Sequence, residues 1–450
     1  MDEAIVHGQS GSPPERRLSR RPEQRDCPAP RRFLLLTADT GLGHRITAQS
    51  LASALTDLYG DCCQVEIANP MNDARTPEFL REGQADYDKA VREMPELYQL
   101  GYQMSDVPLA AAIIETGLTV MLSEVVRDLL NRCQPDAIVT THQNYLAPLR
   151  AVFEGNGRRI PLFTVVTDLS NVHQMWFNPV SDLCFVPNEL VREQALKYGL
   201  PPEKIRVTGI PVSPEMAKQE EDVAAIREKL GWRTDLKTVL VVGGKRVANL
   251  PDALRVLNHS ALPLQLAVVA GGDNELYQTL LNTKWHLPAH LYNFVDNMAT
   301  LMHASDCVIC KAGGLIVTES LACGLPLILF GVIPGQETGN ANYVVDSGAG
   351  ELAQSAFDVL EILLHWLENG GELLARRASN ARQLGRPYAS YEVAEMVWAA
   401  AQEGPSRQPK GILKGLAGLN SWLEYLDSLL KREFRLKETG KTAHLGSEEG

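Results

Sequence analysis

Short apolar runs alternate with longer amphipathic stretches from residue 33 onward, which is the pattern of strands separated by helices. A second block of the same kind begins at residue 239 and runs to about 385. Strands connected through helices form parallel sheets with right-handed crossovers. The pattern therefore predicts an α/β fold with two doubly wound, Rossmann-like domains that face a cleft. The strand-like runs of the first block lie at 33–37, 64–67, 137–140, 162–167 and 183–187, with helical stretches at 44–59 and around 85–131.

The segments outside these two blocks differ in composition. The first 31 residues are rich in Pro, Ser, Gly and Arg, a composition that cannot bury enough surface to fold. Residues 213–236 are polar and charged, as in a linker. We expect a disordered arm (1–31), an N-terminal domain (32–212), a linker (213–236), a C-terminal domain (237–388), a closing helix (389–402) and an amphipathic extension with a tail (403–450).

Composition limits the class of protein. The chain has 450 residues, 45% of them apolar, which is enough for two domains of about 150–200 residues each. A formal net charge of −12 argues against a general nucleic-acid binder. No uninterrupted apolar run reaches the roughly 18 residues of a membrane span, and the N-terminus lacks the apolar core of a secretory signal. We expect a cytoplasmic protein.

Eight cysteines are spread through apolar segments without the pattern of a secreted disulfide framework, so we expect reduced thiols. Cys307 and Cys310 have metal-like spacing, but neither a second pair nor nearby histidines complete four ligands. The one Asp-x-Asp sequence, at 86–88, lies in a charged helical stretch and reads as solvated surface. The sequence predicts no metal site.

In the first block, Gly41 and Gly43 follow the first strand and let a ligand approach the backbone closely. His44 comes directly after them, at the start of the next helix. This histidine is a candidate general base acting on a hydroxyl group. The alternative is a histidine that caps the helix or is simply buried.

Further polar residues follow other strands of the first block. Asp168 comes after the strand at 162–167, where its carboxylate could orient a histidine or accept a hydroxyl proton, unless it only caps a turn. His142 follows another strand and belongs to the same cleft by topology. His173 and Trp176 lie in the loop after Asp168, on the same side of the cleft.

The glycine loops of the second block argue against two common nucleotide-binding classes. The loop after its first strand reads Gly243, Gly244, Lys245, which is neither the Gly-x-Gly-x-x-Gly of a nicotinamide site nor a P-loop. Gly313 and Gly314 instead open a helix whose free N–H groups can hold a diphosphate without a metal.

Polar residues after these glycines fit a nucleotide sugar. Glu319 lies one to two turns into the helix, where it would reach a pair of ribose hydroxyls unless it faces solvent. Gln336, Glu337 and Asn340 follow a Pro-Gly kink and offer several donors and acceptors close together, the inventory needed to bind sugar hydroxyls. An Asx-type surface loop is the alternative.

These residues carry a family resemblance that covers about residues 33–385. The chain resembles monogalactosyldiacylglycerol synthases and the related processive diacylglycerol glucosyltransferases, and through them the transferase that adds N-acetylglucosamine to peptidoglycan lipid precursors. The matching stretches run in family order: Asp-Thr-Gly-Leu-Gly-His-Arg at 39–45, Val-Val-Thr-Asp-Leu-Ser at 165–170 with Trp-Phe at 176–177, Gly-Ile-Pro-Val at 209–212, Lys-Ala-Gly at 311–313 with Glu319, Ile-Pro-Gly-Gln-Glu at 333–337 with Asn340, Tyr-Val-Val at 343–345 and Gly-Ala-Gly at 348–350.

The resemblance implies the two-domain glycosyltransferase B-type fold, with a lipid acceptor in the N-terminal half and a uridine-diphosphate sugar in the C-terminal half. It implies inverting transfer of a hexose from UDP-galactose or UDP-glucose to diacylglycerol, with no cofactor or metal. His44 matches the proposed base, although the roles of base and orienting group stay open between His44 and Asp168. On the donor side it implies Gly243, Gly244, Lys245, Phe294, Lys311, Gly313, Gly314, Glu319, Gln336, Glu337 and Asn340, and on the acceptor side Gly41, Gly43, His142, His173 and Trp176.

The chain also departs from the family pattern. The family's three-glycine loop is here Gly243-Gly244-Lys245, and its Pro-Gly-Thr helix opening is Gly-Leu-Ile at 314–316. The lost Thr hydroxyl weakens the expected phosphate contacts, and Lys245 or Lys311 could supply positive charge instead. The donor hexose stays open, and so do a polyprenyl or soluble acceptor and a non-catalytic sugar-nucleotide sensor.

Two segments suggest contact with a membrane. Residues 108–122 are mostly apolar, which fits a buried helix or a surface that touches lipid. Leucines and aromatics at helical spacing over 412–434, with basic residues toward both ends, fit an interfacial helix or one that docks on the protein itself. We expect a peripheral protein on the cytoplasmic face of an anionic membrane.

Overall fold

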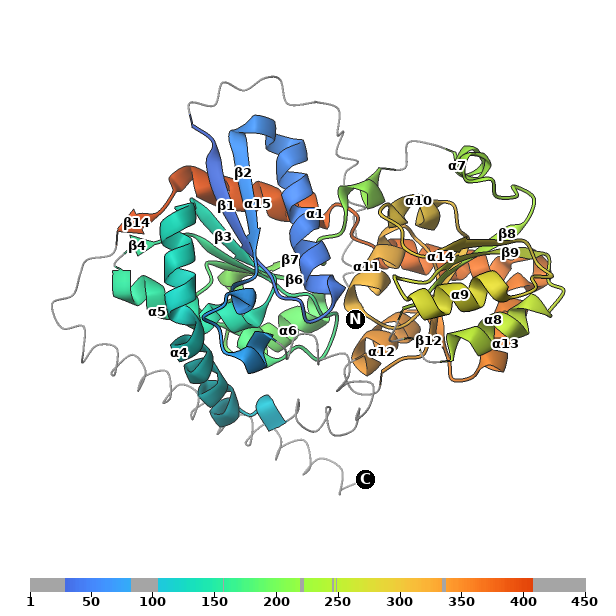
Figure 1. Ribbon diagram of the computed structural model, residues 1–450, viewed down its shortest axis with the longest axis horizontal. Helices are drawn as coiled ribbons and strands as arrows, with labels where there is room; N and C mark the ends of the chain where they lie inside the picture. Colours follow the sequence, from blue (N-terminus) through green and yellow to red (C-terminus); the bar gives the residue numbers. More distant parts are fainter. Residues whose placement is uncertain are drawn as a thin grey trace, which may run out of the picture.

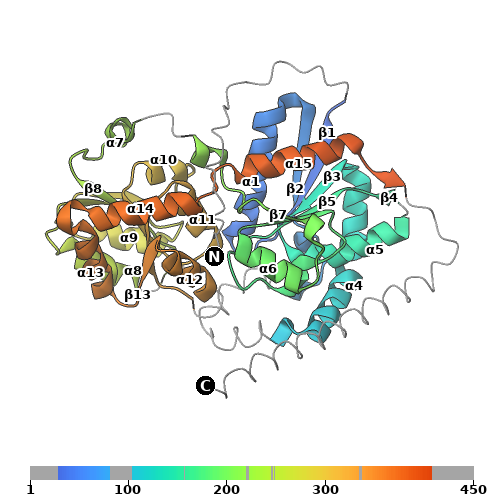
Figure 2. The same cartoon turned by 180° about the vertical axis from the view of Figure 1, so that it is seen from behind.

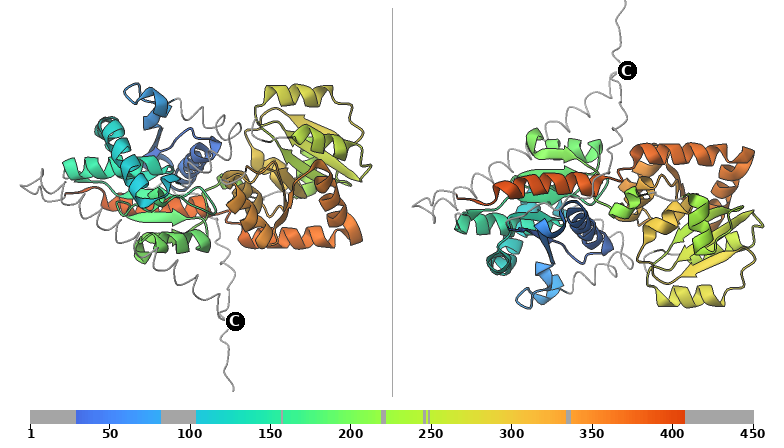
Figure 3. Two further views of the ribbon diagram at one scale, coloured as in Figure 1. Left: turned by 90° about the horizontal axis from the view of Figure 1, so that it is seen from below. Right: turned by 90° about the horizontal axis from the view of Figure 1, so that it is seen from above.

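The computed structural model describes residues 29–81, 104–156, 158–218, 222–244, 247, 249–333 and 337–407. Most of the predicted N-terminal arm, the Asp-x-Asp at 86–88 and the predicted amphipathic helix at 412–434 lie outside these residues. Two separate α/β units make up the described chain, and they lie side by side (Figure 1 and Figure 3).

The N-terminal unit is built on a parallel six-stranded sheet of order β2-β1-β3-β5-β6-β7. Several of its strands are buried on both faces, as in parallel sheets covered by helices. The strands are β1 (Arg31–Leu36), β2 (Cys63–Ala68), β3 (Ala137–Thr140), β5 (Leu162–Val165), β6 (Leu183–Val186) and β7 (Ile205–Val207). The helices are α1 (Leu42–Tyr59), α4 (Pro108–Cys133), α5 (Leu146–Asn156) and α6 (Glu189–Lys197).

The C-terminal unit repeats this architecture with the order β10-β9-β8-β11-β12-β13, again fully parallel. Its strands are β8 (Lys237–Val242), β9 (Leu264–Val269), β10 (Ala289–Tyr292), β11 (Cys307–Cys310), β12 (Leu327–Phe330) and β13 (Gly350–Ala353). Its helices are α7 (Val223–Leu230), α8 (Leu250–Asn258), α9 (Asn274–Asn282), α10 (Met298–His303), α11 (Gly314–Ala322), α12 (Thr338–Asp346), α13 (Ala356–Leu367) and α14 (Glu372–Leu384). The predicted fold class is confirmed.

The strand orders locate the functional edges of both sheets. The chain runs outward from β1 to β2 and returns to β3 on the other side of β1, and it does the same at β8 and β11. The loops that follow these central strands therefore diverge at a topological switch point, where ligands bind in doubly wound sheets. His44 and His142 follow β1 and β3, and Gly243 and Gly313 follow β8 and β11.

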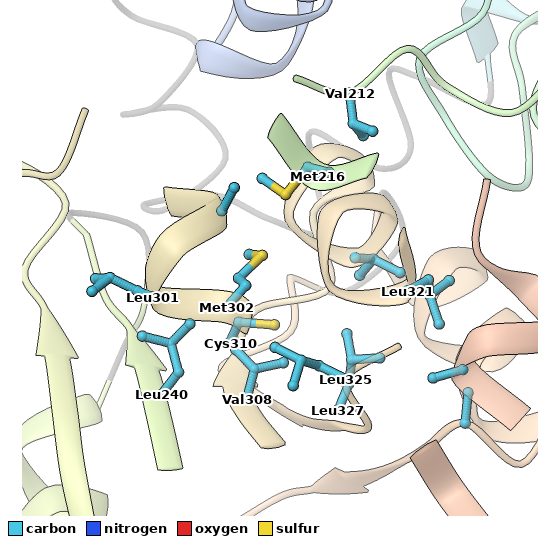
Figure 4. Close-up of a cluster of buried hydrophobic side chains, with 14 of the residues drawn as sticks. Val212, Met216, Leu240, Leu301, Met302, Val308, Cys310, Leu321, Leu325 and Leu327 are labelled. Atoms are coloured by element: carbon cyan, nitrogen blue, oxygen red, sulfur yellow. The ribbon is translucent and has the colours of Figure 1, made fainter. Parts of the chain in front are cut away.

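The segment predicted as a linker is partly built into the C-terminal core. It carries a short 3-10 turn (Pro214–Ala217) and α7, and its Ile226 and Trp232 join the buried cluster beneath β8 and β11. Figure 4 shows Met216 of the turn in the same cluster of buried side chains as Leu321 of α11. The composition looked like that of a linker because many residues of this segment are polar and lie at the surface. The apolar side chains of Ile226 and Trp232 nevertheless anchor the segment in the C-terminal core.

The closing helix, α15 (Ala389–Glu403), returns to the N-terminal unit (Figure 2). Its buried residues join the core formed by β1, β3 and α1, and Trp398 stacks on Tyr59 with ring centres 3.9 Å apart. Beyond it, β14 (Ser406–Arg407) pairs antiparallel with β4 (Arg158–Arg159). The chain therefore crosses between the two units twice.

Helix α4 corrects the expectation that no segment could span a membrane. Its 26 residues are long and apolar enough by length and composition alone. The expectation rested on uninterrupted apolar runs. It therefore missed a long helix in which a few charged residues interrupt an otherwise apolar sequence. One face of α4 packs into the N-terminal core through Leu118, Leu122 and Val126. The opposite face is apolar and exposed over its first half, at Leu109 and Ile113.

Six of the seven described cysteines are free, as expected for reduced thiols. Cys62 is the exception, because it is disulfide-bonded. Cys307 and Cys310 are buried in β11 as packed thiols.

Candidate functional site

The two units meet where the N-terminus of α11 approaches the loop after β5. A β-carbon at Gly314 would lie 2.5 Å from the carbonyl oxygen of Thr167, so this contact requires glycine. A β-carbon at Gly43, at the start of α1, would lie 3.8 Å from Leu315 of α11. The amino ends of α1 and α11 thus converge on one junction, with Asp168 between the domains.

His44 is held in one tautomer by its surroundings. Its Nδ1 lies 2.7 Å from the carbonyl oxygen of Thr141 and 3.1 Å from Oγ1 of Thr167. Because a carbonyl only accepts hydrogen bonds, Nδ1 carries the proton and Nε2 keeps its lone pair. Burial lowers the pKa of His44 to about 4, against a smaller opposing effect of the bond to Thr141. The imidazole is therefore neutral and able to accept a proton at physiological pH.

His142 and Trp176 surround His44. The rings of His44 and His142 meet edge to face with centroids 4.8 Å apart, and the Trp176 ring lies 6.2 Å from His44 and 6.3 Å from His142. Trp176 is buried. The pKa of His142 lies well below its ordinary value because of burial and because of His44 beside it. The structure thus brings three of the predicted acceptor-side and catalytic residues into one cluster.

Asp168 lies beside charged residues of the C-terminal domain. Burial and the negative charge of Glu337 raise the pKa of Asp168 to about 6, while Lys311 opposes this shift. Among the described residues its carboxylate accepts no hydrogen bond. Asp168 also does not contact Nδ1 of His44, since Thr141 and Thr167 occupy that position.

Lys311 and Glu337 form an ion pair next to Gly313. The Glu337 side chain is only 5% exposed, and its second oxygen accepts a hydrogen bond from the Ile333 N–H at 3.2 Å. Lys311 is more accessible, at 24%. A β-carbon at Gly313 would lie 3.0 Å from the Lys311 ammonium, so a positive charge lies at the N-terminus of α11.

Glu319 is buried in α11, and its carboxyl has no hydrogen-bond partner among the described residues. Burial raises the pKa of this carboxyl to about 8. A polar group in this state costs free energy unless a ligand satisfies it. Phe294, after β10, is 62% exposed and lies near Gly272.

The glycine loop after β8 is tightly packed. A β-carbon at Gly243 would lie 2.8 Å from Leu250, and one at Gly271 would lie 2.6 Å from the Gly243 carbonyl oxygen. Gly244 has a φ of +146° and open space around its β-carbon position. Lys245 and Gln336, both predicted donor contacts, lie outside the described residues.

Comparisons with known proteins agree with this layout. Residues 44–212 match the profile of the monogalactosyldiacylglycerol (MGDG) synthase family, and residues 238–384 match the C-terminal domain of glycosyltransferase family 28. The chain is 31% identical over 374 residues to a probable chloroplastic monogalactosyldiacylglycerol synthase of Nicotiana tabacum, covering 81% of this chain and 70% of the relative. The corresponding protein of Glycine max is 33% identical over 376 residues, with the same coverage.

The chain belongs to the monogalactosyldiacylglycerol synthase family. It is a glycosyltransferase, and both the suspected family and the enzyme class are confirmed. Among solved structures, MurG of Acinetobacter baumannii aligns with a TM-score of 0.52 and 18% identity, covering 82% of this chain and all of that one. That likeness supports the two-domain glycosyltransferase B-type fold.

Within this family member, two predicted contact residues are occupied by other partners. Asn340 is buried, its Oδ1 accepts the Leu169 N–H at 3.2 Å and its Nδ2 donates to the Ala312 carbonyl at 3.0 Å. The bond from the Leu169 N–H joins the two domains, while the bond to the Ala312 carbonyl lies within the C-terminal domain. A sugar hydroxyl would therefore have to share the Asn340 amide with these protein partners, and the Asn340 amide has a structural role in domain docking.

His173 is also engaged by protein. Its Nδ1 accepts the Met175 N–H at 3.2 Å, and its Nε2 lies 3.3 Å from the Ser105 hydroxyl. Asp106 lies 3.6 Å from the same Nδ1. His173 thus ties the segment before α4 to the loop after β5.

Sequence reasoning missed Thr167 as a partner of His44. Its hydroxyl contributes one of the two contacts that fix the Nδ1 side of the ring. The available signal was its place next to Asp168 at the carboxyl end of a strand. The Thr141 contact comes from a backbone carbonyl, which no residue type reveals.

Proposed function

We propose that this protein transfers a hexose from a UDP-sugar to the free hydroxyl of diacylglycerol, with inversion at the anomeric carbon. The observation that carries the proposal is a neutral His44 with an unprotonated Nε2 at the junction with the N-terminus of α11. A base on one domain and an anion-binding helix end on the other suit a two-substrate transfer. The names of the related synthases support the lipid product.

The reaction needs one proton acceptor and one stabilised leaving group. His44 Nε2 takes the proton of the acceptor hydroxyl as its oxygen bonds to the anomeric carbon. The bond from that carbon to the diphosphate breaks on the opposite face, and UDP leaves with its additional negative charge. Base catalysis contributes roughly 10²–10⁴-fold to such a step. Attack opposite the leaving group inverts the configuration.

We assign the base role to His44 and a charge-balancing role to Asp168. Nδ1 of His44 already faces Thr141 and Thr167, so an orienting carboxylate is not needed there. An ionised Asp168 would instead favour the positive charge that develops on His44 and on the sugar during transfer.

On the donor side, the proposal uses groups of the C-terminal domain. The free N–H groups of α11 and the Lys311 ammonium would bind the diphosphate, with no metal or other cofactor. Glu319 would accept hydrogen bonds from the ribose hydroxyls, which would offset the cost of its burial. Glu337 and Gln336 would bind the sugar, and the exposed Phe294 ring would stack on uracil.

We propose that the protein acts at the surface of a membrane, on its cytoplasmic face, without spanning it. Leu109, Ile113 and Val120 of α4 are 61%, 66% and 79% exposed on one side of the helix, which favours contact with lipid. The second half of that side carries charged residues, including Glu124 and Arg127, which favour water. A helix that is apolar at one end and charged at the other fits partial immersion in an anionic surface.

The test is product formation from defined substrates. The protein is incubated with UDP-galactose or UDP-glucose and diacylglycerol in anionic vesicles, and the lipid is analysed by mass spectrometry and by NMR of its anomeric proton. The proposal predicts one β-linked hexosyl diacylglycerol from an α-linked donor. An α-linked product would contradict inversion. UDP binding without any lipid product would favour a different acceptor or a sugar-nucleotide sensor.

A further inference from the structure

His44 and His142 present opposite hydrogen-bonding groups. Nδ1 of His44 faces the Thr141 carbonyl and is protonated, so its Nε2 is an acceptor. Nδ1 of His142 accepts the Asn144 N–H at 3.3 Å, so its Nε2 carries the proton and is a donor. The backbone of a single loop, residues 141–144, fixes both tautomers.

The two rings are close enough to contact neighbouring atoms of one small molecule. Their centroids are 4.8 Å apart, and Trp176 packs against both. The loops that carry the histidines also hold buried side-chain atoms, Thr40 Oγ1 and Gln143 Oε1, that have no hydrogen-bond partner among the described residues. Buried polar atoms of this kind cost free energy until they are hydrogen-bonded. This edge of the sheet is therefore suited to a polar group of a ligand.

We propose that His142 donates from Nε2 to the ester carbonyl next to the reacting hydroxyl of the lipid, so that the histidine pair selects a hydroxyl with an ester on the adjacent carbon. The inference rests on the proposed function and identifies the feature of diacylglycerol that is recognised. The hydroxyl gives its proton to Nε2 of His44. The ester carbonyl oxygen accepts a hydrogen bond from the Nε2–H of His142, and that proton stays on His142. A 1,2-diacylglycerol carries both groups on neighbouring carbons.

The hydrogen bonds of His142 distinguish lipid recognition from two other roles, that of a catalytic base and that of a purely structural residue. His142 cannot serve as the base through Nε2, because that nitrogen already carries a proton. A purely structural role would need only Nδ1, which accepts the Asn144 N–H. Asparagine can reproduce the Nδ1 position of histidine and glutamine the Nε2 position. The substitutions His142→Asn and His142→Gln therefore distinguish a structural role from recognition of the lipid.

The experiment compares a 1,2-diacylglycerol with its 1,2-dialkyl ether analogue, which lacks the carbonyl oxygens, in the same vesicles. We expect wild-type protein to use the ester with a KM roughly three- to tenfold lower than the ether, the effect of one neutral hydrogen bond. His142→Gln should keep most of this preference and His142→Asn should lose it. The KM for the UDP-sugar and the acid limb of the pH profile should be unchanged in both variants.

Equal KM values for ester and ether in the wild-type protein would overturn the inference, and this comparison needs no folded variant. Equal ester preference in His142→Asn and wild type would also overturn it. Absence of product from both lipids, with UDP still bound, would instead reject the proposed function on which the inference rests.

Discussion

The carbonyl oxygen of Thr141 lies 2.7 Å from Nδ1 of His44 and thereby holds the other ring nitrogen unprotonated. The two residues come from loops after neighbouring strands, β3 and β1, and are 97 positions apart in the chain. Their contact determines which face of the imidazole is basic. The catalytic account depends on this relationship.

Thr167 should assist the same ring. Its Oγ1 lies 3.1 Å from Nδ1 of His44, so Thr167→Val removes a polar partner at nearly constant volume. We expect kcat to fall roughly three- to tenfold with little change in the KM for the donor. Thr167→Ser keeps the hydroxyl and is the matched control. Steady-state kinetics of both variants checks this, and a valine variant with wild-type kcat would exclude the contribution.

The pH dependence of kcat/KM, which reports ionisations of the free enzyme, should follow Asp168 and not His44. Burial lowers the pKa of His44 to about 4, whereas burial and Glu337 raise the pKa of Asp168 to about 6. Activity should therefore increase as the pH rises through about 6, where Asp168 becomes ionised. In Asp168→Asn this limb should vanish, leaving a lower kcat/KM that declines only near pH 4. If activity of the variant still rose through pH 6, the ionisation responsible would belong to a group other than Asp168.

Glu319 should make the unliganded protein less stable as the pH rises. The folded-state pKa of about 8 lies above the ordinary value of 4.5, so between these values the unfolded state binds fewer protons and stability falls. Glu319→Gln cannot ionise. The Tm of this variant relative to wild type should therefore be a few degrees higher at pH 8 than at pH 4.5, while its affinity for UDP should decrease. Parallel pH dependence of Tm in both proteins would contradict the burial of an uncompensated carboxyl.

Asn340 should matter for domain docking more than for sugar recognition. Asn340→Ala removes the hydrogen bonds to Leu169 and Ala312 from a buried site. We expect the free energy of unfolding to fall by about 1–3 kcal/mol, with kcat reduced and the KM for the donor little changed. Urea unfolding and steady-state kinetics measure the two effects. If the KM for the donor rose while the free energy of unfolding stayed unchanged, the result would support the predicted contact of Asn340 with the sugar instead.

Much of the architecture could be predicted because parallel sheets leave a strong local pattern. Strands such as β5 are buried on both faces and read as continuous apolar runs, and the glycines before His44 and Glu319 mark strand-to-helix turns. The family resemblance then implied a lipid acceptor near the turn before His44 and a UDP-sugar near the turn before Glu319. The sequence alone therefore placed His44 and Gly313 after strands, and the structure has them after β1 and β11.

The remainder depends on contacts between distant parts of the chain. The contacts of Asn340 and His173 follow from domain docking and from the approach of the segment before α4, neither of which leaves a periodic signal. The apolar first half of α4 was visible in the sequence, but its division into a buried face and an exposed face depends on how the helix packs against the sheet. The tautomer of His44 depends on a backbone atom and so on the strand order.

The most direct test of the central claim is the rate of hexose transfer to diacylglycerol by His44→Gln, beside His365→Gln at an exposed histidine of the C-terminal domain. The account predicts a loss of roughly 10²-fold or more for His44→Gln, with unchanged affinity for UDP and full activity in the control. Transfer by His44→Gln within about threefold of wild type, well short of the effect of a lost base, would contradict the assignment of His44 as the base.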